Sequence, residues 1–266
     1  MQIAPLTPRH IPQIRALQPP DWGDIIPAFA FYLASPICAP IGVQVADRLV
    51  GVGCVIRFPR SAWIGHIIVD PAHRRRGIAT TIVRALLDHV QDDQLVSVSL
   101  VATASGYPVY RRFGFADAGS YSFYEIDGVF PGAPPTLATV APETGDHDRL
   151  SAFDAAVVGE DRSQLLQPHL SGARVVKTDG AIVGVWYPRL GEGLVEAVDP
   201  AVGVALLELR LRGASRCVVP SANRAANTFL IQNGFYKVRD GFRMTLGPQP
   251  AWRPELVYSR VGGNLG

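Results

Sequence analysis

The fold of this 266-residue chain is decided by the stretch Trp-Ile-Gly-His-Ile-Ile-Val-Asp-Pro-Ala-His-Arg-Arg-Arg-Gly-Ile-Ala, residues 63–79. Its apolar beginning predicts a strand over 63–69, and the Asp-Pro pair that follows predicts a turn. From Ala79 to Val90, apolar residues recur three and four positions apart, which predicts a helix with one buried face. A strand therefore leads through a charged loop into an amphipathic helix.

The charged loop has the features of an anion site. Amide groups in the first turn of a helix lack internal partners and lie at the positive end of the helix dipole, so they bind phosphate oxygens. A glycine lets the backbone approach a ligand closely, and arginine side chains add charge-assisted hydrogen bonds. The residues concerned are Arg74, Arg75, Arg76, Gly77, Ile78 and Ala79. The pattern predicts a pyrophosphate site, with a solvated basic turn as the alternative. It is neither a Walker loop nor a dinucleotide fingerprint, because Gly-Lys-Ser/Thr and two further glycines are missing.

The remaining patterns of the first half predict a hairpin, a half-buried strand, a short helix that ends at a glycine, and a last strand. These lie at residues 41–46 and 49–58, 96–102, up to 114, and 121–126. Strands that pair first as a meander and then connect through helices indicate a mixed α/β or α+β sheet.

The second half repeats this order in a weaker form. Val-Asp-Pro-Ala occurs at 69–72 and again at 198–201, and Asn-Gly-Phe at 233–235 matches Phe-Gly-Phe at 113–115. After the shared motif the second copy is three residues shorter and lacks the arginines, which indicates an internal repeat with one charged loop. Prolines among small and polar residues predict a linker between the copies. The expected organisation is a first domain at 1–130, a linker at 131–143 and a second domain at 144–266.

The composition excludes several classes of protein. Hydrophobic residues make up 48% of the chain and charged residues 18%, with a mean hydropathy of +0.16, which indicates a globular protein. The formal net charge of +2 is too small for electrostatic capture of nucleic acid or an anionic membrane. Residues 25–46 are uncharged, but three prolines interrupt them, so we expect no membrane span. The widely spaced Cys38, Cys54 and Cys217 predict buried thiols in a reducing compartment, the cytoplasm.

A second informative segment, residues 103–115, reads Thr-Ala-Ser-Gly-Tyr-Pro-Val-Tyr-Arg-Arg-Phe-Gly-Phe. With this segment the chain resembles the GNAT superfamily of acyl-CoA-dependent N-acetyltransferases. The resemblance rests on Arg-x-x-Gly-x-Ala after a strand (Arg74, Gly77, Ala79), followed by Tyr-x-x-x-Gly-Phe (Tyr110, Gly114, Phe115). The second half resembles the degenerate carboxyl-terminal acetyltransferase domain of some bacterial two-domain members. Residues 22–46 match neither pattern, and in this family that region tends to shape the acceptor pocket.

The resemblance implies tandem GNAT folds, each with a mixed, mostly antiparallel central sheet flanked by helices. It implies a cytoplasmic enzyme that transfers an acetyl group from acetyl-CoA to an amine of a small molecule or peptide, by direct attack in a ternary complex. In such enzymes the strand before the loop is splayed at its end, where backbone groups hold the pantetheine arm and polarise the thioester carbonyl. That position corresponds to Ile67, Ile68 and Val69. The loop from Arg74 to Thr80 then takes the pyrophosphate.

The resemblance also assigns two polar residues. Tyr110 stands where the family places the acid that protonates the leaving thiolate, and a phenol is protonated at neutral pH. Aromatic packing against the sheet is the alternative role. Thr103 stands where the family often has an asparagine that binds the pantetheine, which implies a weaker or different contact.

The general base has one candidate on the central strand. The amine must lose a proton before it attacks, and His66 lies on the strand that leads into the site. A structural or exposed histidine is the alternative role, and a water chain can replace the base. Asp70 is expected to shape the turn before Pro71.

The second half lacks both elements, because Leu230 stands where the first half has Tyr110. We expect that this half does not bind acyl-CoA and instead closes one wall of the acceptor site. Asp161 and Arg162 are its candidate contacts there, with helix capping as the alternative. Scattered histidines and the lack of Cys-x-x-Cys or His-Glu-x-x-His predict no metal. The alternative function is a non-catalytic acyl-CoA-binding or regulatory protein; the acceptor, the acyl chain and a homodimer stay open.

Overall fold

The computed structural model describes residues 1–90, 95–132 and 137–266. The strands are β1 (Gln2–Pro5), β2 (Cys38–Val45), β3 (Arg48–Arg57), β4 (Ser61–Val69), β5 (Ser97–Ala102), β6 (Ala116–Glu125), β7 (Arg174–Thr178), β8 (Ala181–Tyr187), β9 (Leu194–Ala197), β10 (Arg216–Pro220), β11 (Tyr236–Leu246) and β12 (Val257–Ser259). The α-helices are α1 (Ile11–Ala16), α2 (Ile26–Ala34), α3 (Ile78–Asp88), α4 (Tyr107–Arg111), α5 (His147–Val158), α6 (Ser163–Leu166), α7 (Pro200–Leu211) and α8 (Arg224–Gln232).

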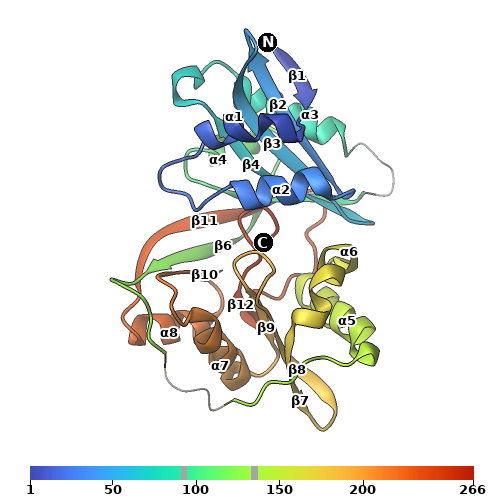
Figure 1. The fold of residues 1–266 in the computed structure, drawn as a ribbon, viewed down its shortest axis with the longest axis vertical. Helices are drawn as coiled ribbons and strands as arrows, with labels where there is room; N and C mark the ends of the chain where they lie inside the picture. Colours follow the sequence, from blue (N-terminus) through green and yellow to red (C-terminus); the bar gives the residue numbers. More distant parts are fainter. Residues whose placement is uncertain (91–94, 133–136) are drawn as a thin grey trace.

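These strands form two sheets. The larger has the order β1-β2-β3-β4-β5-β11-β6-β10 and the smaller β12-β9-β8-β7. Within the described residues, β4 and β5 pair in parallel and the other neighbours pair antiparallel. Helices flank both sheets (Figure 1). The predicted class, a mixed α/β protein with a mostly antiparallel sheet flanked by helices, is confirmed.

The larger sheet contains strands from both halves of the sequence. β11 lies between β5 and β6, with Phe242 opposite Ala102 on one side and Ser120 on the other. β6 in turn lies between β11 and β10, with Tyr121 opposite Gly241 and Pro220. Each half thus places a late strand beside a strand of the other half, an exchange that the sequence did not predict. The exchange satisfies backbone groups that would otherwise form open sheet edges.

The exchange of strands does not test the predicted linker at residues 131–143. Pro134 and Pro135 lie outside the described residues, so the boundaries 1–130 and 144–266 stay a prediction.

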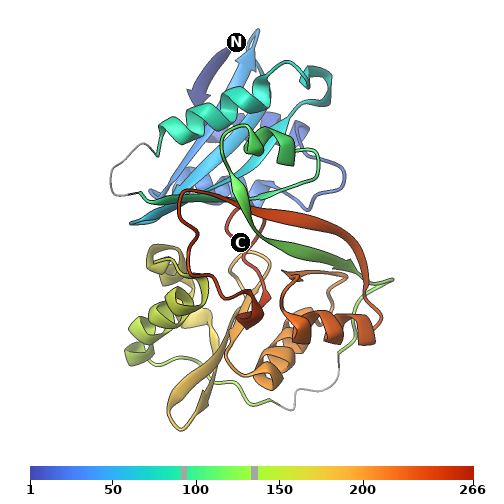
Figure 2. The ribbon, with the colours of Figure 1, turned by 180° about the vertical axis from the view of Figure 1, so that it is seen from behind.

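Helices cover the two faces of the larger sheet differently. α1 and α2 lie on one face (Figure 1), and α3 and α4 lie on the other (Figure 2). The core under α3 is built from side chains such as Ile82 and Leu86, both fully buried. The core under α1 and α2 contains Phe29 and continues into the second half through Leu150 and Leu166. A shared core of this kind holds the two halves against each other.

Several boundaries differ from the sequence prediction, and the structure gives a reason for two of them. The hairpin turns at Ala46 and Asp47, which both have positive φ (47° and 60°), because such turns match the twist of paired strands. β6 begins at Ala116, five residues earlier than expected, because Thr245 of the neighbouring β11 pairs with it there.

Candidate functional site

The site is built around a gap in the sheet between β4 and β5. The two strands pair only where they begin, at Ser61 with Ser97 through Trp63 with Ser99. β4 continues to Val69 and stays paired there with β3 on its other side. Beyond Trp63, one edge of β4 therefore faces an opening rather than a neighbouring strand. The backbone groups on that edge include those of the predicted Ile67, Ile68 and Val69.

The turn after β4 is fixed by Asp70, as the sequence predicted. One carboxylate oxygen accepts a hydrogen bond from the amide of Ala72 at 2.9 Å, and the other accepts one from Arg48 at 2.9 Å. The amide of Ala72, followed by the charge of Arg48, holds the pKa of the buried Asp70 below its usual value. The turn thus leads the chain away from the sheet toward the arginine loop.

The arginine loop presents open donor groups at the start of α3. Arg74 donates from Nε to the carbonyl of Val69 at 3.2 Å, and the three side chains Arg74, Arg75 and Arg76 are exposed. Gly77 begins the helix with φ 79°, and a Cβ there would meet no heavy atom within 4 Å. This open space beside first-turn amides and guanidinium groups fits a pyrophosphate.

The other loop residues contribute backbone rather than side chain. The side chain of Ile78 is buried in the core under α3. Ile78 can therefore offer only its backbone to a ligand in the loop. Ala79 and Thr80 are half-buried.

Tyr110 lies on α4 at the same side of the sheet as α3. Its ring packs against Phe115, with 6.0 Å between ring centroids, and burial raises the pKa of its phenol. The phenol therefore stays protonated well above neutral pH. Thr103 lies in the turn before this helix, where its hydroxyl accepts from the amide of Gly106 at 3.2 Å and contacts Ser105 at 3.1 Å. The Thr103 hydroxyl is thus engaged locally.

His66 lies at a β-bulge on β4. Val52 faces Ile68 and Cys54 faces Gly65, so the one residue between them on β3 faces two residues of β4. His66 has φ 51°, a conformation that bulges use and that non-glycine residues adopt infrequently. The bulge turns the imidazole toward α2, on the face opposite α3.

The imidazole is enclosed by aromatic rings that the sequence reading did not identify. The ring centroids of Trp22, Phe29 and Tyr32 lie 5.9, 5.6 and 5.5 Å from that of His66. The Tyr32 hydroxyl forms a hydrogen bond with Nδ1 at 2.6 Å. Burial, with a smaller effect of Arg260, lowers the pKa of His66 to about 4, so the ring is neutral at pH 7. These aromatic residues lie in residues 22–46, where the sequence offered no motif, and no local signal marks them.

The end of the chain reaches this side of the site. A Cβ at Gly65 would lie 2.5 Å from Cβ of Asn264, so the segment after β12 lies directly against β4. Burial raises the pKa of the Tyr32 phenol, and the Asn264 side chain beside it acts in the opposite direction. Asn264, Tyr32 and His66 thus form a chain of contacts from the second half into the first.

Asp161 and Arg162 both form hydrogen bonds within the second half. The Asp161 carboxylate accepts from the amide of Ser163 at 3.0 Å, which is the capping role. Arg162 is buried, donates to Asp154 at 3.1 Å and donates to the carbonyl of Leu265 at 3.0 Å. Its guanidinium holds the segment that carries Asn264.

The corresponding region of the second half is closed. β12 pairs with β9, with Val257 opposite Glu196, and also packs against β10. Asn223 donates to the carbonyl of Val257 at 2.9 Å. Leu230, at the position of Tyr110, is fully buried. A strand therefore fills the place where the first half has its opening.

Two further findings concern metals and membranes. In residues 1–90, 95–132 and 137–266, no group of three or more His, Cys, Asp or Glu side chains is placed to hold a metal ion. Over the same residues, no helix has the length and apolar character needed to cross a bilayer. The three cysteines are free, and Cys38 is half-buried rather than buried as predicted.

Diverging strands, an arginine loop at a helix N-terminus and a nearby tyrosine fit the class of acyltransferases, and comparisons with known proteins support that class. The model of the acetyltransferase (GNAT) family matches residues 11–115. The uncharacterised N-acetyltransferase YitH of Bacillus subtilis is 31% identical over 194 residues, 68% of each chain. The chain belongs to the GNAT acetyltransferase family.

Solved structures show how far the fold extends. A candidate acetyltransferase from Pyrococcus horikoshii has a TM-score of 0.83 at 23% identity. The superposition covers 100% of this chain and 95% of the Pyrococcus chain. A tandem GNAT protein from the clavulanic acid biosynthesis pathway has a TM-score of 0.59 at 15% identity, covering 93% and 99%. The likeness in fold thus extends over both halves of the chain.

Proposed function

We propose that the chain is an N-acetyltransferase that moves an acetyl group from acetyl-CoA to the amine of a small molecule or peptide, with the chemistry in the first half. The observation that carries the proposal is the combination, at one opening of the sheet, of free β4 backbone, the arginine loop and the protonated Tyr110. We further propose a tandem organisation in which the second copy has lost its cofactor site.

The residues present fit acetyl-CoA. The first-turn amides of α3 and the exposed Arg74, Arg75 and Arg76 would hold the pyrophosphate. The edge of β4 from Ile67 to Val69, which does not pair with β5, would bind the pantetheine arm by backbone hydrogen bonds. When bound, the cosubstrate supplies a thioester carbonyl as the electrophile. A β4 amide aimed at the developing oxyanion would stabilise the transition state.

Tyr110 supplies a proton at its phenol oxygen. Burial keeps that oxygen protonated, so Tyr110 can donate to the sulfur that leaves as the amine nitrogen bonds to the carbonyl carbon. The carbon–sulfur bond breaks, and the proton of Tyr110 neutralises the thiolate. Tyr110 then regains a proton through solvent.

His66 is proposed as the base on the opposite face. In the tautomer in which Nδ1–H donates to the Tyr32 oxygen, Nε2 keeps a lone pair that can accept a proton from the attacking nitrogen. A ring with a pKa of about 4 is a weak base. Its suitable partner is therefore the acidic nitrogen that has already bonded to the carbonyl carbon, not the free ammonium ion.

The second half is proposed as a wall of the acceptor site. Asn264 contacts Tyr32, and Arg162 holds the segment that carries Asn264. This arrangement makes the acceptor pocket depend on both halves. The filled region between β9 and β10 supports the prediction that acyl-CoA binds once per chain.

The test combines calorimetry with an assay of thiol release. Acetyl-CoA should bind at one site per chain, and Tyr110→Phe should leave that affinity unchanged while it lowers the turnover number by roughly 10²–10⁴-fold. Tyr107→Phe is the matched control, because that exposed phenol bonds Asp117 at 3.0 Å. Binding without thiol release for any amine in the wild type would support the non-catalytic alternative, and no binding would refute both.

A further inference from the structure

A second concave site lies where the exchanged strands meet the segment that follows β11. It has a volume of about 240 Å³. The residues that line it are Ala118, Gly119, Ser120, Ala222, Arg243, Gln249, Pro250, Trp252 and Pro254. None of them belongs to the transfer site described above. The volume is below the roughly 300–1,000 Å³ of pockets for drug-sized ligands, so the cavity suits a small molecule.

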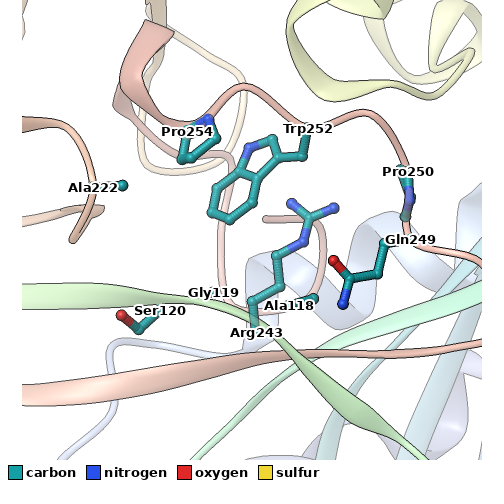
Figure 3. Close-up of a pocket in the computed structure, with 9 residues that line it drawn as sticks. All are labelled: Ala118, Gly119, Ser120, Ala222, Arg243, Gln249, Pro250, Trp252 and Pro254. Atoms are coloured by element: carbon teal, nitrogen blue, oxygen red, sulfur yellow. The ribbon is translucent and has the colours of Figure 1, made fainter.

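Arg243 is the charged group of this cavity. The residue is 2% exposed, and Figure 3 shows its guanidinium between Trp252 and Gln249. The guanidinium carbon lies 4.1 Å from the ring centroid of Trp252 and 4.8 Å from that of Trp63. Indole rings pack against the plane of the group, so a ligand approaches the N–H edge.

The guanidinium is not fully hydrogen-bonded. One terminal nitrogen is buried and faces a carboxylate oxygen of Glu160 at 3.6 Å, and neither atom has a hydrogen-bond partner in the described residues. Glu160 directs its other oxygen to Ser61 at 3.1 Å and to Trp63 at 2.8 Å. A guanidinium has five N–H donors, and leaving them unbonded in a buried place is costly.

The walls of the cavity are fixed from several sides. Trp252 lies so close to Gly119 that a Cβ there would be 2.8 Å from its ring, and the backbone of Ala251 would overlap a Cβ at Gly159. The amide of Arg253 donates to the carbonyl of Val157 at 2.8 Å. Walls held this way keep their shape before a ligand arrives, which lowers the entropic cost of binding.

We propose that this cavity binds a small organic carboxylate, whose oxygens accept in-plane hydrogen bonds from Arg243. The planar fork of arginine matches the two oxygens of a carboxylate. Trp252, Pro250 and Pro254 offer apolar surface to the rest of the ligand, which favours an organic carboxylate over inorganic phosphate. The site is separate from the site of acetyl transfer.

The experiment is a calorimetric titration of the full chain with sodium benzoate and with neutral benzamide. We expect one benzoate per chain and at least about tenfold weaker binding of benzamide, because the charged partner is lost. Arg243→Lys keeps the charge but removes the fork, and Ala222→Leu fills the exposed mouth of the cavity. Each should weaken benzoate binding at least about tenfold.

Arg253→Lys is the matched control, since Arg253 is on the same segment, does not line the cavity and pairs with Glu255 at 3.5 Å. It should leave benzoate binding unchanged. If Arg243→Lys fails to fold, Ala222→Leu decides alone. Saturating coenzyme A should also leave benzoate binding unchanged. The proposal is overturned by absent saturable binding, by equal binding of benzamide, by indifference to Ala222→Leu, or by displacement with coenzyme A.

Discussion

The first half opens its sheet between β4 and β5, and the second half closes the same place between β9 and β10 with β12. The Asp-Pro turn is common to both: Asp70 accepts from Ala72, and Asp199 accepts from Ala201 at 2.7 Å. After Asp199, α7 begins at once, whereas α3 begins only after the arginine loop. The comparison teaches that one turn supports either a ligand site or a packed core. The outcome depends on three loop residues and on a strand from elsewhere in the chain.

The largest predicted effect concerns the exchanged strands. A chain of residues 1–130 lacks β11, so β5 and β6 lose the strand that pairs with both. We expect this fragment to show no cooperative unfolding by circular dichroism, because a central strand and its hydrogen bonds are missing.

The control for that fragment keeps every strand. The full chain, cut only within the linker 131–143 and purified as two associated fragments, should unfold cooperatively. A fragment of residues 1–130 with a melting transition like that of the full chain would show that the exchanged strand is dispensable.

The second prediction makes the first half resemble the second. Replacing Arg74, Arg75 and Arg76 with alanine should weaken acetyl-CoA binding about 100-fold, because charge-assisted hydrogen bonds to the phosphates are lost. The remaining affinity should depend less on salt than that of the wild type. Arg84→Ala, which removes an exposed arginine farther along α3, should change neither quantity in calorimetric titrations. Wild-type affinity in the triple variant would leave the loop as a solvated basic turn.

The sequence predicted the parts of the molecule that depend on neighbours along the chain. The strand, turn, arginine loop and helix of residues 63–79 were found because each carries a local pattern. No local pattern predicts the position of β11 in the sheet. Its alternation of side chains suits any sheet edge, and the pairing of Phe242 with Ala102 joins residues far apart in sequence. Tyr32 and Asn264 were missed for the same reason, since only the folded chain brings them to His66.

The third prediction tests the burial of His66, which has no counterpart in the closed region of the second half. Its pKa is about 4 in the folded protein and near 6.5 in an unfolded chain, so between these values the unfolded state binds more protons. The free energy of unfolding therefore falls as the pH drops through this window. From pH 6.5 to 4.5 the contribution of His66 is about 2 kcal/mol at most.

The variant His66→Gln should lose that part of the pH dependence, as measured by urea unfolding at both pH values. His89→Gln, at an exposed position, should keep the wild-type dependence. Equal slopes for His66→Gln and the wild type would mean that the imidazole titrates normally in the folded protein.

The smallest predicted effect tests how tightly β12 closes the second half. A Cβ at Gly203 on α7 would overlap the ring of Tyr258, which is 1% exposed on β12, whereas a Cβ at Gly77 on the open side meets nothing within 4 Å. Glycine to alanine within a helix ordinarily stabilises by about 0.5–1 kcal/mol, but overpacking a core costs about 1–3 kcal/mol. The second effect is larger, so Gly203→Ala should lower the free energy of unfolding by about 1 kcal/mol. Gly145→Ala, where nothing lies within 4 Å, should not lower it. Urea unfolding of the two variants measures this difference. If Gly203→Ala were stabilised, α7 and β12 could separate at little cost, as an open cofactor site in the second half would require.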